Sequence, residues 1–232
     1  MTLAKNIRAL LRRGPTRAKA PETADTSAIW SERARNFGRR SVYNLSIRDE
    51  EFDEITQFQE NELFPLLSAR LFSPPKNVLD YGCGAGRFTA SLRALTKSES
   101  ALGFDPCPEL ITMAVASTVD PQTSFLTSTP REFFDGLRLQ FDLVWIATVL
   151  GGIADSEINK LADDITLALR PGGLLFFAEN TAPEDPNNSF WRSRPEAWYE
   201  KLFNTRGVEV AGIGLYESCG SEVSVFAGRK CH

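Results

Sequence analysis

A short apolar run in this chain leads directly into three alternating glycines, a pattern that few folds accommodate. Residues 78–88 read Val-Leu-Asp-Tyr-Gly-Cys-Gly-Ala-Gly-Arg-Phe, so that Gly82, Gly84 and Gly86 follow closely behind Asp80. Glycine is used where the backbone must turn sharply or where a ligand lies directly against the main chain. The segment therefore predicts a strand, a ligand-binding loop and the start of a helix.

The spacing of these glycines separates two classes of ligand. A dinucleotide loop needs glycines at its first, third and sixth positions, whereas here the third glycine comes one residue early and Arg87 occupies the sixth position. Asp80 adds a carboxylate two residues before the first glycine, where it would repel a diphosphate and attract an ammonium group. The predicted ligand therefore carries a cationic amino-acid end, and Arg87 disfavours a nicotinamide dehydrogenase.

Further landmarks follow in order along the chain. A second apolar run ends at Asp105, 25 positions after Asp80, and a carboxylate at a strand tip can accept both hydroxyls of a ribose. An apolar run with an acid near its start spans residues 141–146, and Leu-Arg-Pro-Gly-Gly at residues 169–173 precedes another apolar run that ends at Glu179. Together these segments resemble the class I S-adenosylmethionine-dependent methyltransferases, whose first motif is acid-x-Gly-x-Gly-x-Gly.

Short apolar runs alternate with helical stretches from residue 76 onward, which predicts an α/β fold with a parallel sheet and helices on both faces. The resemblance implies a Rossmann-like, doubly wound, seven-stranded sheet with an N-terminal helical cap, in which the last strand is inserted antiparallel. Ligands of such sheets bind at the carboxyl ends of the strands, where the strand order reverses. The expected strands span residues 77–81, 100–104, 123–127, 141–146, 173–179, 208–216 and 222–227.

Three segments are expected along the chain. They are a flexible basic tail and linker at residues 1–28, a helical cap that covers the substrate at residues 29–75, and the S-adenosylmethionine-binding core at residues 76–230. Between Phe52 and Leu67, apolar residues at helical spacing predict a helix that packs on the first strand as scaffold.

Charge is distributed unevenly along the chain. The net charge is −4, yet residues 1–21 carry six cations and no acid, which leaves 20 cations and 30 acids in the rest. Because phosphate binding needs a basic groove, the acidic body argues against a nucleic-acid partner. The tail is either a solvated terminus or an amphipathic segment that contacts an anionic membrane surface or a partner. Its apolar side chains share one helical face at Leu3, Ile7, Leu10 and Leu11.

Neither a membrane-spanning segment nor a secretory signal is expected. No run reaches the roughly 18 apolar residues of a spanning helix, and cations interrupt the N-terminal stretch where a signal needs an uncharged core. The expected location is therefore cytoplasmic, with peripheral membrane contact through the tail as an alternative. The cysteines are interpreted as free thiols in a reducing compartment, because no metal-ligand pairing is seen among Cys83, Cys107, Cys219 and Cys231.

The resemblance assigns cofactor contacts to positions that match the family's motifs. Asp80 would orient the methionine ammonium group, and the glycine loop would admit the methionine and ribose. Asp105 would bind the ribose, although its place before two prolines also suits a helix N-cap. The third strand ends without the acid that often binds adenine, so hydroxyl and backbone groups are expected there. The expected S-adenosylmethionine contacts are Asp80, Gly82, Cys83, Gly84, Gly86, Asp105, Pro106, Thr127, Ser128 and Ala147, with no metal.

Few residues are candidates for catalysis. The only histidine is His232, so no imidazole is expected in the site as a general base. Methyl transfer is an in-line displacement on an activated sulfonium carbon, for which alignment and desolvation supply much of the rate. A base is needed only for a protonated, weakly acidic nucleophile. Glu179 is the candidate, with Asp155 and Tyr43 as alternatives, and Glu179 equally suits a helix-capping or substrate-binding acid.

The acceptor is expected to enter between the cap and the segment that follows Glu179. Aromatic side chains in the cap, together with tryptophan and arginine at residues 191–194, suit a flat acceptor that bears oxygens or a carboxylate. The aromatics could equally pack on the core. The expected acceptor-binding residues are Trp30, Phe37, Tyr43, Trp191, Arg192 and Arg194.

The predicted activity is methyl transfer to a small-molecule or a sugar- or lipid-linked acceptor, at oxygen. N-methylation of a small amine is the nearer alternative, because a free amine needs less help from a base. A non-catalytic methyltransferase-fold binding subunit is another alternative, suggested by Gly151 and Gly152, which replace an acid and a histidine of many relatives. The intact Asp80, glycine loop and Asp105 argue against it, since a site without a ligand has no physical need of them.

Overall fold

The computed structural model describes residues 26–43, 45, 47–135, 137–182, 191–218 and 220–231. The amphipathic pattern of residues 1–21 lies outside the described residues. In the described part of the chain, seven strands form one sheet in the order β3-β2-β1-β4-β5-β7-β6. The strands are β1 (Asn77–Tyr81), β2 (Ser100–Phe104), β3 (Thr123–Leu126), β4 (Phe141–Ala147), β5 (Leu169–Asn180), β6 (Val208–Ser218) and β7 (Ser221–Lys230).

The sheet is parallel from β3 to β5 and antiparallel at its other end. β1 pairs in parallel with β2 and β4, whereas β7 is inserted antiparallel between β5 and β6. The expected doubly wound, seven-stranded sheet is therefore confirmed. The chain leaves β1 toward β2 and β3 and then returns to β4 on the other side of β1. The carboxyl ends of β1 and β4 thus border the position at which such sheets bind ligands.

Four strands, β4 to β7, are longer than the sequence predicted, and β5 differs most. β5 begins at Leu169 rather than at Gly173, because Leu169 pairs with Phe141 before the register shifts. The neighbouring Arg170 donates to the carboxylate of Asp142 at 2.9 Å, which holds this end of β5 against β4. The Leu-Arg-Pro-Gly-Gly segment is therefore included in β5, at the point where its register with β4 shifts.

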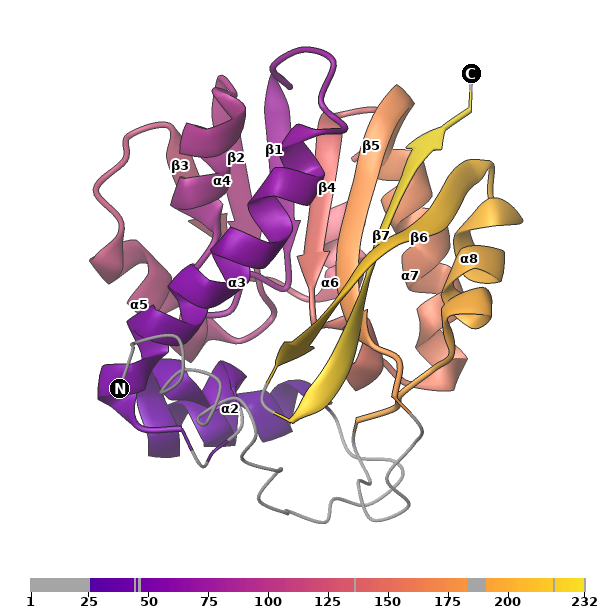
Figure 1. The fold of residues 1–232 in the computed structure, drawn as a ribbon. Coiled ribbons are helices and arrows are strands. Elements are labelled where there is room, and N and C mark those ends of the chain that lie inside the picture. The colour runs from indigo at the N-terminus through magenta and orange to yellow at the C-terminus, as the bar shows by residue number, and fades with distance from the viewer. Residues whose placement is uncertain are drawn as a thin grey trace.

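Helices cover both faces of the sheet, and Figure 1 shows α3 crossing one face while α7 and α8 lie behind the other. α3 and α4 contribute to the core of the first face, and α6, α7 and α8 to that of the second. The helices are α2 (Thr26–Phe37), α3 (Phe52–Ser68), α4 (Thr89–Thr96), α5 (Pro108–Ser117), α6 (Pro130–Phe134), α7 (Asp155–Ala168) and α8 (Glu196–Asn204). Short 3-10 helices are η1 (Gly38–Val42), η2 (Asp49–Glu51) and η3 (Leu150–Gly152).

Each face of the sheet carries its own buried core. On the α3 face, Leu63 packs with Trp145, which stacks on Phe176 with 4.9 Å between ring centres. On the α7 face, Phe177 stacks on Phe226 at 4.6 Å. A doubly wound sheet is buried on both sides, which explains why its strands are nearly continuous apolar runs. The helix predicted before the first strand is α3, and it packs on the sheet as scaffold.

The cap lies across the carboxyl ends of the parallel strands. Figure 1 shows α2 below these ends, and Ala34 of α2 packs on Ala85 of the glycine loop. Arg33 ties α2 to the residues that follow it, because its guanidinium donates to the carbonyl oxygens of Ser41 at 2.8 Å and Tyr43 at 2.9 Å. The cap therefore forms one wall beside the glycine loop.

None of the described helices is long and apolar enough to cross a membrane. Cys83, Cys107 and Cys231 are free thiols, and Cys219 lies outside the described residues. Within the described ranges, no group of three histidine, cysteine or acidic side chains could hold a metal ion.

Candidate functional site

The loop between β1 and α4 adopts backbone conformations that glycine tolerates and other residues avoid. Gly82, Gly84 and Gly86 have φ angles of 73°, 56° and 78°, in the left-handed region where a side chain is disfavoured. The amide groups of Gly82 and Cys83 donate to the carbonyl oxygen of Phe104 at 2.7 and 3.0 Å. The end of β2 therefore fixes the shape of the loop.

Asp105 directly follows β2 and faces this loop. Its carboxylate accepts the amide N–H of Gly84 at 3.0 Å and that of Cys107 at 2.9 Å, one on each oxygen. Each carboxylate oxygen can accept two hydrogen bonds, so the buried side chain keeps acceptor capacity for a ligand hydroxyl beside the loop. The N-cap of α5 is Cys107, and the capping role considered for Asp105 is wrong.

Asp80 is buried near the end of β1. The hydroxyl of Thr89, at the start of α4, donates to its carboxylate at 2.6 Å. Burial raises the pKa of Asp80 to about 7, while the Thr89 hydrogen bond and the charge of Arg87 oppose the rise. Burial likewise raises the pKa of Asp105 to about 6 against its two amide donors. Two acids therefore flank the glycine loop, an arrangement that suits a ligand with one positive charge and hydroxyl groups.

Two valines from separate segments lie against the loop. A Cβ atom on Gly82 would lie 2.5 Å from Val149, and one on Gly84 would lie 2.7 Å from Val42. Val42 belongs to η1 in the cap, and Val149 lies between β4 and η3. Neither contact leaves room for a side chain on the loop, so these two segments approach its backbone directly and bound the site.

The other predicted cofactor residues lie at the same end of the sheet. Thr127 and Ser128 follow β3, and both are half-buried. Pro106 follows the strand-tip acid of β2, and Ala147 is the last residue of β4; both are also half-buried. The strand ends thus bring all four residues to the edge of the sheet that carries the glycine loop.

Thr148, directly after β4, has a strained backbone that no pattern in the sequence indicated. Its φ is 54°, which is rare for a β-branched residue and costs about 1–3 kcal/mol. Its amide donates to the carbonyl oxygen of Ala178, and its hydroxyl to that of Ala147, both at 2.7 Å. Threonine normally favours extended backbone, so its type gives no signal. Strain of this kind clusters at binding and catalytic sites.

Glu179, the candidate base, is 0% exposed at the end of β5. Its carboxylate accepts the amide N–H groups of Val149 at 2.7 Å, Leu150 at 2.6 Å and Gly151 at 3.2 Å. Burial raises the pKa of Glu179 to about 7, although these donors and the charge of Arg194 oppose the rise. Because both oxygens face the start of η3, the geometry favours the helix-capping interpretation over that of a base.

The two arginines predicted to bind the acceptor both have partners within the protein. Arg194 donates to the carbonyl oxygens of Leu150 and Ile153, both at 2.9 Å, and to the carboxylate of Asp155 at 2.6 Å. Arg192 lies 3.6 Å from the same carboxylate. Arg194 is only 6% exposed, and its hydrogen bonds hold the segment between β4 and α7 in place. Asp155, considered as an alternative base, is the first residue of α7 and is paired with both arginines.

A cavity of about 390 Å³ lies beside the contacts of Asp155 with the two arginines. Its walls come from α7, from α8 and from the segment that precedes α8, and no residue of the glycine loop lines it. The lining residues are Asp155, Ile158, Asn159, Arg192, Ser193, Arg194 and Trp198. The cavity is therefore separate from the space beside Asp80 and Asp105.

Two of the predicted acceptor-binding aromatics both lie close to η3. A Cβ atom on Gly151 would lie 2.5 Å from the indole of Trp191, and one on Gly152 would lie 3.4 Å from Trp191 and 3.9 Å from Nε1 of Trp30. Trp30 comes from α2 in the cap, and Trp191 comes from the chain beyond β5. The pair of glycines thus has a packing reason, because Trp191 fills the space that a side chain on Gly151 would need.

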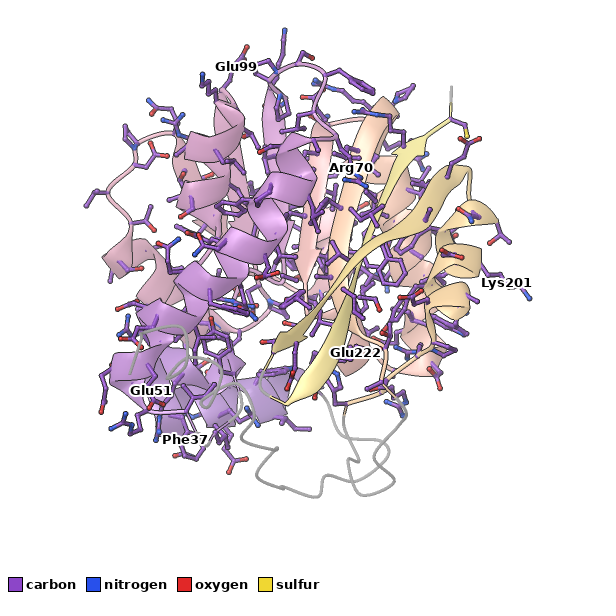
Figure 2. The ribbon with its side chains drawn as sticks, viewed as in Figure 1. Phe37, Glu51, Arg70, Glu99, Lys201 and Glu222 are labelled. Carbon is purple, nitrogen blue, oxygen red and sulfur yellow. The ribbon has the colours of Figure 1, made fainter. Side chains whose placement is uncertain are left out.

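The other two cap aromatics have different surroundings. Tyr43 is 7% exposed, and its hydroxyl lies 2.9 Å from that of Thr56 and 2.8 Å from Nη1 of Arg87. Phe37 is half-buried at the end of α2, and Figure 2 places it at the outer edge of the cap. The guanidinium carbon of Arg40 lies 5.4 Å from its ring centre. Tyr43 therefore belongs to a polar network under the cap, whereas Phe37 lies at the periphery.

Comparison with known proteins adds a family and several similar folds. A family model described as a methyltransferase domain matches residues 52–210. The chain is 25% identical over 131 residues to a trans-aconitate 2-methyltransferase from Azoarcus sp. (strain BH72). This match covers 56% of the chain and 49% of the relative, so the chain spans about half the length of the curated relative that it matches.

Solved structures show the same fold at low identity. The complex of DhpI with SAH has a TM-score of 0.66 and 18% identity, with 89% of this chain and 95% of that chain covered. Human N-acetylserotonin methyltransferase in complex with SAM has a TM-score of 0.59 and 18% identity, with 89% and 67% covered.

Proposed function

The chain belongs to the methyltransferase domain family and is a class I S-adenosylmethionine-dependent methyltransferase, and on that premise we propose that it methylates an oxygen atom of a small molecule. S-adenosylmethionine supplies a methyl group that is already activated on a sulfonium centre. The protein's own task is therefore to hold the two reactants in line and to exclude water.

The observation that carries the cofactor part of this proposal is the position of Asp105 beside the glycine loop. Its carboxylate is held by the amide groups of Gly84 and Cys107 and keeps one acceptor site on each oxygen for the ribose hydroxyls. Asp80 would bind the ammonium group of the methionine end. Because the loop between them is built on glycines, a ligand can lie against the main chain.

The acceptor would lie on the β4 side of the cofactor, under Trp30 and Trp191. Both indoles approach Gly152, and they would enclose the acceptor between the cap and the chain beyond β5. Glu179 and Arg194 would act as positioning residues there. They hold the amide and carbonyl groups of the segment after β4, and neither presents a free group to the acceptor.

Methylation at oxygen sets a condition on the acceptor, because the protein itself engages two of the candidate bases. Glu179 faces three amide groups and Asp155 faces two arginines, so we infer an acceptor oxygen that arrives deprotonated, as in a carboxylate or an acidic hydroxyl. The curated relative is named for trans-aconitate and the human neighbour for N-acetylserotonin, which supports a small-molecule acceptor. A sugar- or lipid-linked acceptor and a small amine are the competing proposals.

The test is methyl transfer from labelled S-adenosylmethionine to matched panels of carboxylic acids, acidic phenols and amines. Label is expected in carboxylate or phenol products, and Trp191→Ala should reduce transfer while affinity for S-adenosylhomocysteine stays within about twofold. Label found only in amines would replace oxygen by nitrogen as the acceptor atom. Intact cofactor binding without transfer to any panel would favour the non-catalytic binding subunit.

A further inference from the structure

Arg87 follows the last glycine of the loop and has no role in the function proposed above. Arg87 as a residue is half-buried, and its Nη1 donates to the hydroxyl of Tyr43 at 2.8 Å and to the side-chain carbonyl of Gln59. The guanidinium carbon lies 4.7 Å from the ring centre of Tyr43 and 4.2 Å from that of Phe88. Tyr43, Gln59 of α3 and Phe88 at the start of α4 therefore hold this guanidinium in one position.

Within the described residues, Arg87 donates hydrogen bonds only through Nη1. Its Nε and Nη2 groups have no hydrogen-bond partner there. Arg87 also forms no ion pair with a described residue, whereas the half-buried Arg93, Arg170 and Arg206 each pair with a carboxylate. Nε and Nη2 share one edge of the guanidinium plane, a fork that matches a carboxylate bidentately. An anion from outside the chain would complete this site.

We infer that Arg87 binds the α-carboxylate at the amino-acid end of S-adenosylmethionine, opposite Asp80, which binds the α-ammonium group. An amino-acid end is a zwitterion, so its recognition needs one anionic and one cationic partner, and these two residues stand at the two ends of the glycine loop. The inference rests on the proposed function, because it assigns the ligand of that same site. The charge of Arg87 lowers the pKa of Asp80 against the effect of burial, so the two groups interact electrostatically.

The position of Arg87 favours the cofactor over the acceptor as the source of the carboxylate. Arg87 lies on the α4 side of the loop, next to Gln59 of α3. The aromatic pair assigned to the acceptor lies instead over Gly151 and Gly152, after β4. A carboxylate bound by Arg87 would therefore lie beside Gln59 of α3 and near the ammonium site of Asp80, and not under the aromatic pair at η3.

Tyr43 and Gln59 act in this scheme as positioning residues. They occupy Nη1 and leave the Nε–Nη2 edge for the ligand, and Ser218 of β6 in turn accepts from the side-chain amide of Gln59 at 3.0 Å. Tyr43 was predicted to bind the acceptor, but its hydroxyl contacts Arg87. Removing the Tyr43 hydroxyl should make the position of the Arg87 guanidinium less fixed while the guanidinium keeps its charge.

The experiment compares three ligands by calorimetric titration of the full chain. S-adenosylhomocysteine carries the carboxylate, its decarboxylated analogue S-adenosyl-3-thiopropylamine lacks it, and 5′-methylthioadenosine lacks the whole amino-acid end. The variants are Arg87→Gln, Arg87→Lys and Tyr43→Phe. Arg93→Gln is the matched control, because Arg93 lies on α4 but pairs with Asp120.

Arg87→Gln is expected to weaken S-adenosylhomocysteine binding by about 10- to 100-fold, the range of a charge-assisted bidentate contact, and to leave the other two ligands within about twofold. Arg87→Lys should recover part of the loss, Tyr43→Phe should show a smaller selective loss, and Arg93→Gln should show none. Equal weakening of all three ligands would overturn the inference and leave Arg87 a purely structural residue. A raised acceptor KM with unchanged S-adenosylhomocysteine affinity would also overturn it, because the carboxylate would then belong to the acceptor. Failure of the wild-type chain to bind any of the three would instead contradict the proposed function itself.

Discussion

Asp80, Asp105 and Glu179 are buried at the same end of the sheet, and their partners differ in number. Asp80 accepts from one hydroxyl, Asp105 from two amides and Glu179 from three amides. A buried carboxylate is costly unless hydrogen bonds compensate for the loss of water. Glu179 is compensated by the protein alone, whereas Asp80 and Asp105 retain acceptor sites for a ligand.

Replacement of Asp105 tests the ribose assignment. Asp105→Ala should weaken S-adenosylhomocysteine binding by about 1–3 kcal/mol, the cost of leaving buried hydroxyls without a partner. Isothermal titration calorimetry measures the change, with Asp53→Ala as a control that should bind like the wild type, because Asp53 is exposed in the first turn of α3. Unchanged affinity in the Asp105 variant would remove the assignment.

Affinity for S-adenosylhomocysteine should rise with pH. Burial raises the pKa values of Asp80 and Asp105 in the free protein to about 7 and about 6, and the ligand's ammonium and hydroxyl groups require both acids to be ionised. At a pH below these pKa values, ligand binding must release protons from the two acids. As the pH is raised through this range, the dissociation constant should fall by up to about tenfold per pH unit for each proton released. Titrations between pH 5 and 8 in buffers of different ionisation enthalpy measure both effects. A flat profile without proton release would contradict the roles of these acids.

At the scale of elements, β5 and the chain beyond it hold the segment after β4 from two sides. Glu179 accepts the amide groups at the start of η3, and Arg194 donates to its carbonyl groups. Trp191 packs on the glycines between these contacts. These contacts fix the 3-10 helix η3, which would form one side of the proposed acceptor site.

Gly151→Ala should displace Trp191 from its position against η3. The new Cβ would lie 2.5 Å from the indole, so the ring or the backbone must move, at a cost of about 1–3 kcal/mol in the free energy of unfolding. We expect a shift in tryptophan fluorescence and a raised KM for the acceptor, with S-adenosylhomocysteine affinity retained. Gly212→Ala is the matched control, because its Cβ would meet Glu196 only at 3.5 Å. Identical fluorescence and KM in both variants would contradict the role of Trp191.

The secondary-structure elements could be predicted from the sequence, whereas the contacts around η3 could not. The individual cofactor contacts stay predictions. β1 and β2 have the predicted bounds, because local apolar runs and the glycine loop define them. Arg194 was predicted to bind the acceptor. The residues next to it in the sequence do not reveal that it donates to Leu150, which lies 44 positions away. The glycine pair was interpreted as a lost acid and histidine, because only the fold brings Trp191 against it.

For the molecule as a whole, the reversal of strand order beside β1 gathers the site at one end of the sheet. β1, β2, β4 and β5 each contribute a residue or loop at their carboxyl ends, and Figure 1 shows the cap helix α2 at that same end. Because this topology follows from alternating strands and helices, the location of the site could be expected before its side-chain contacts were known.

The basic tail belongs to the same scale, and its role stays a prediction from the sequence. Removal of residues 1–21 takes away six cations and should reduce association with anionic vesicles while leaving methyl transfer to a soluble acceptor unchanged. Vesicle sedimentation with the full and shortened chains measures the difference, with neutral vesicles as control. Equal vesicle binding by the two chains would refute the membrane interpretation.

The most direct test of the central claim is a calorimetric titration of the purified wild-type chain with S-adenosylhomocysteine, with NAD as the comparison ligand. It examines the site formed by Asp80, the glycine loop and Asp105 without knowledge of the acceptor. We predict micromolar binding of S-adenosylhomocysteine and none of NAD. Absence of S-adenosylhomocysteine binding, or tighter binding of NAD, would contradict the assignment of this site to S-adenosylmethionine.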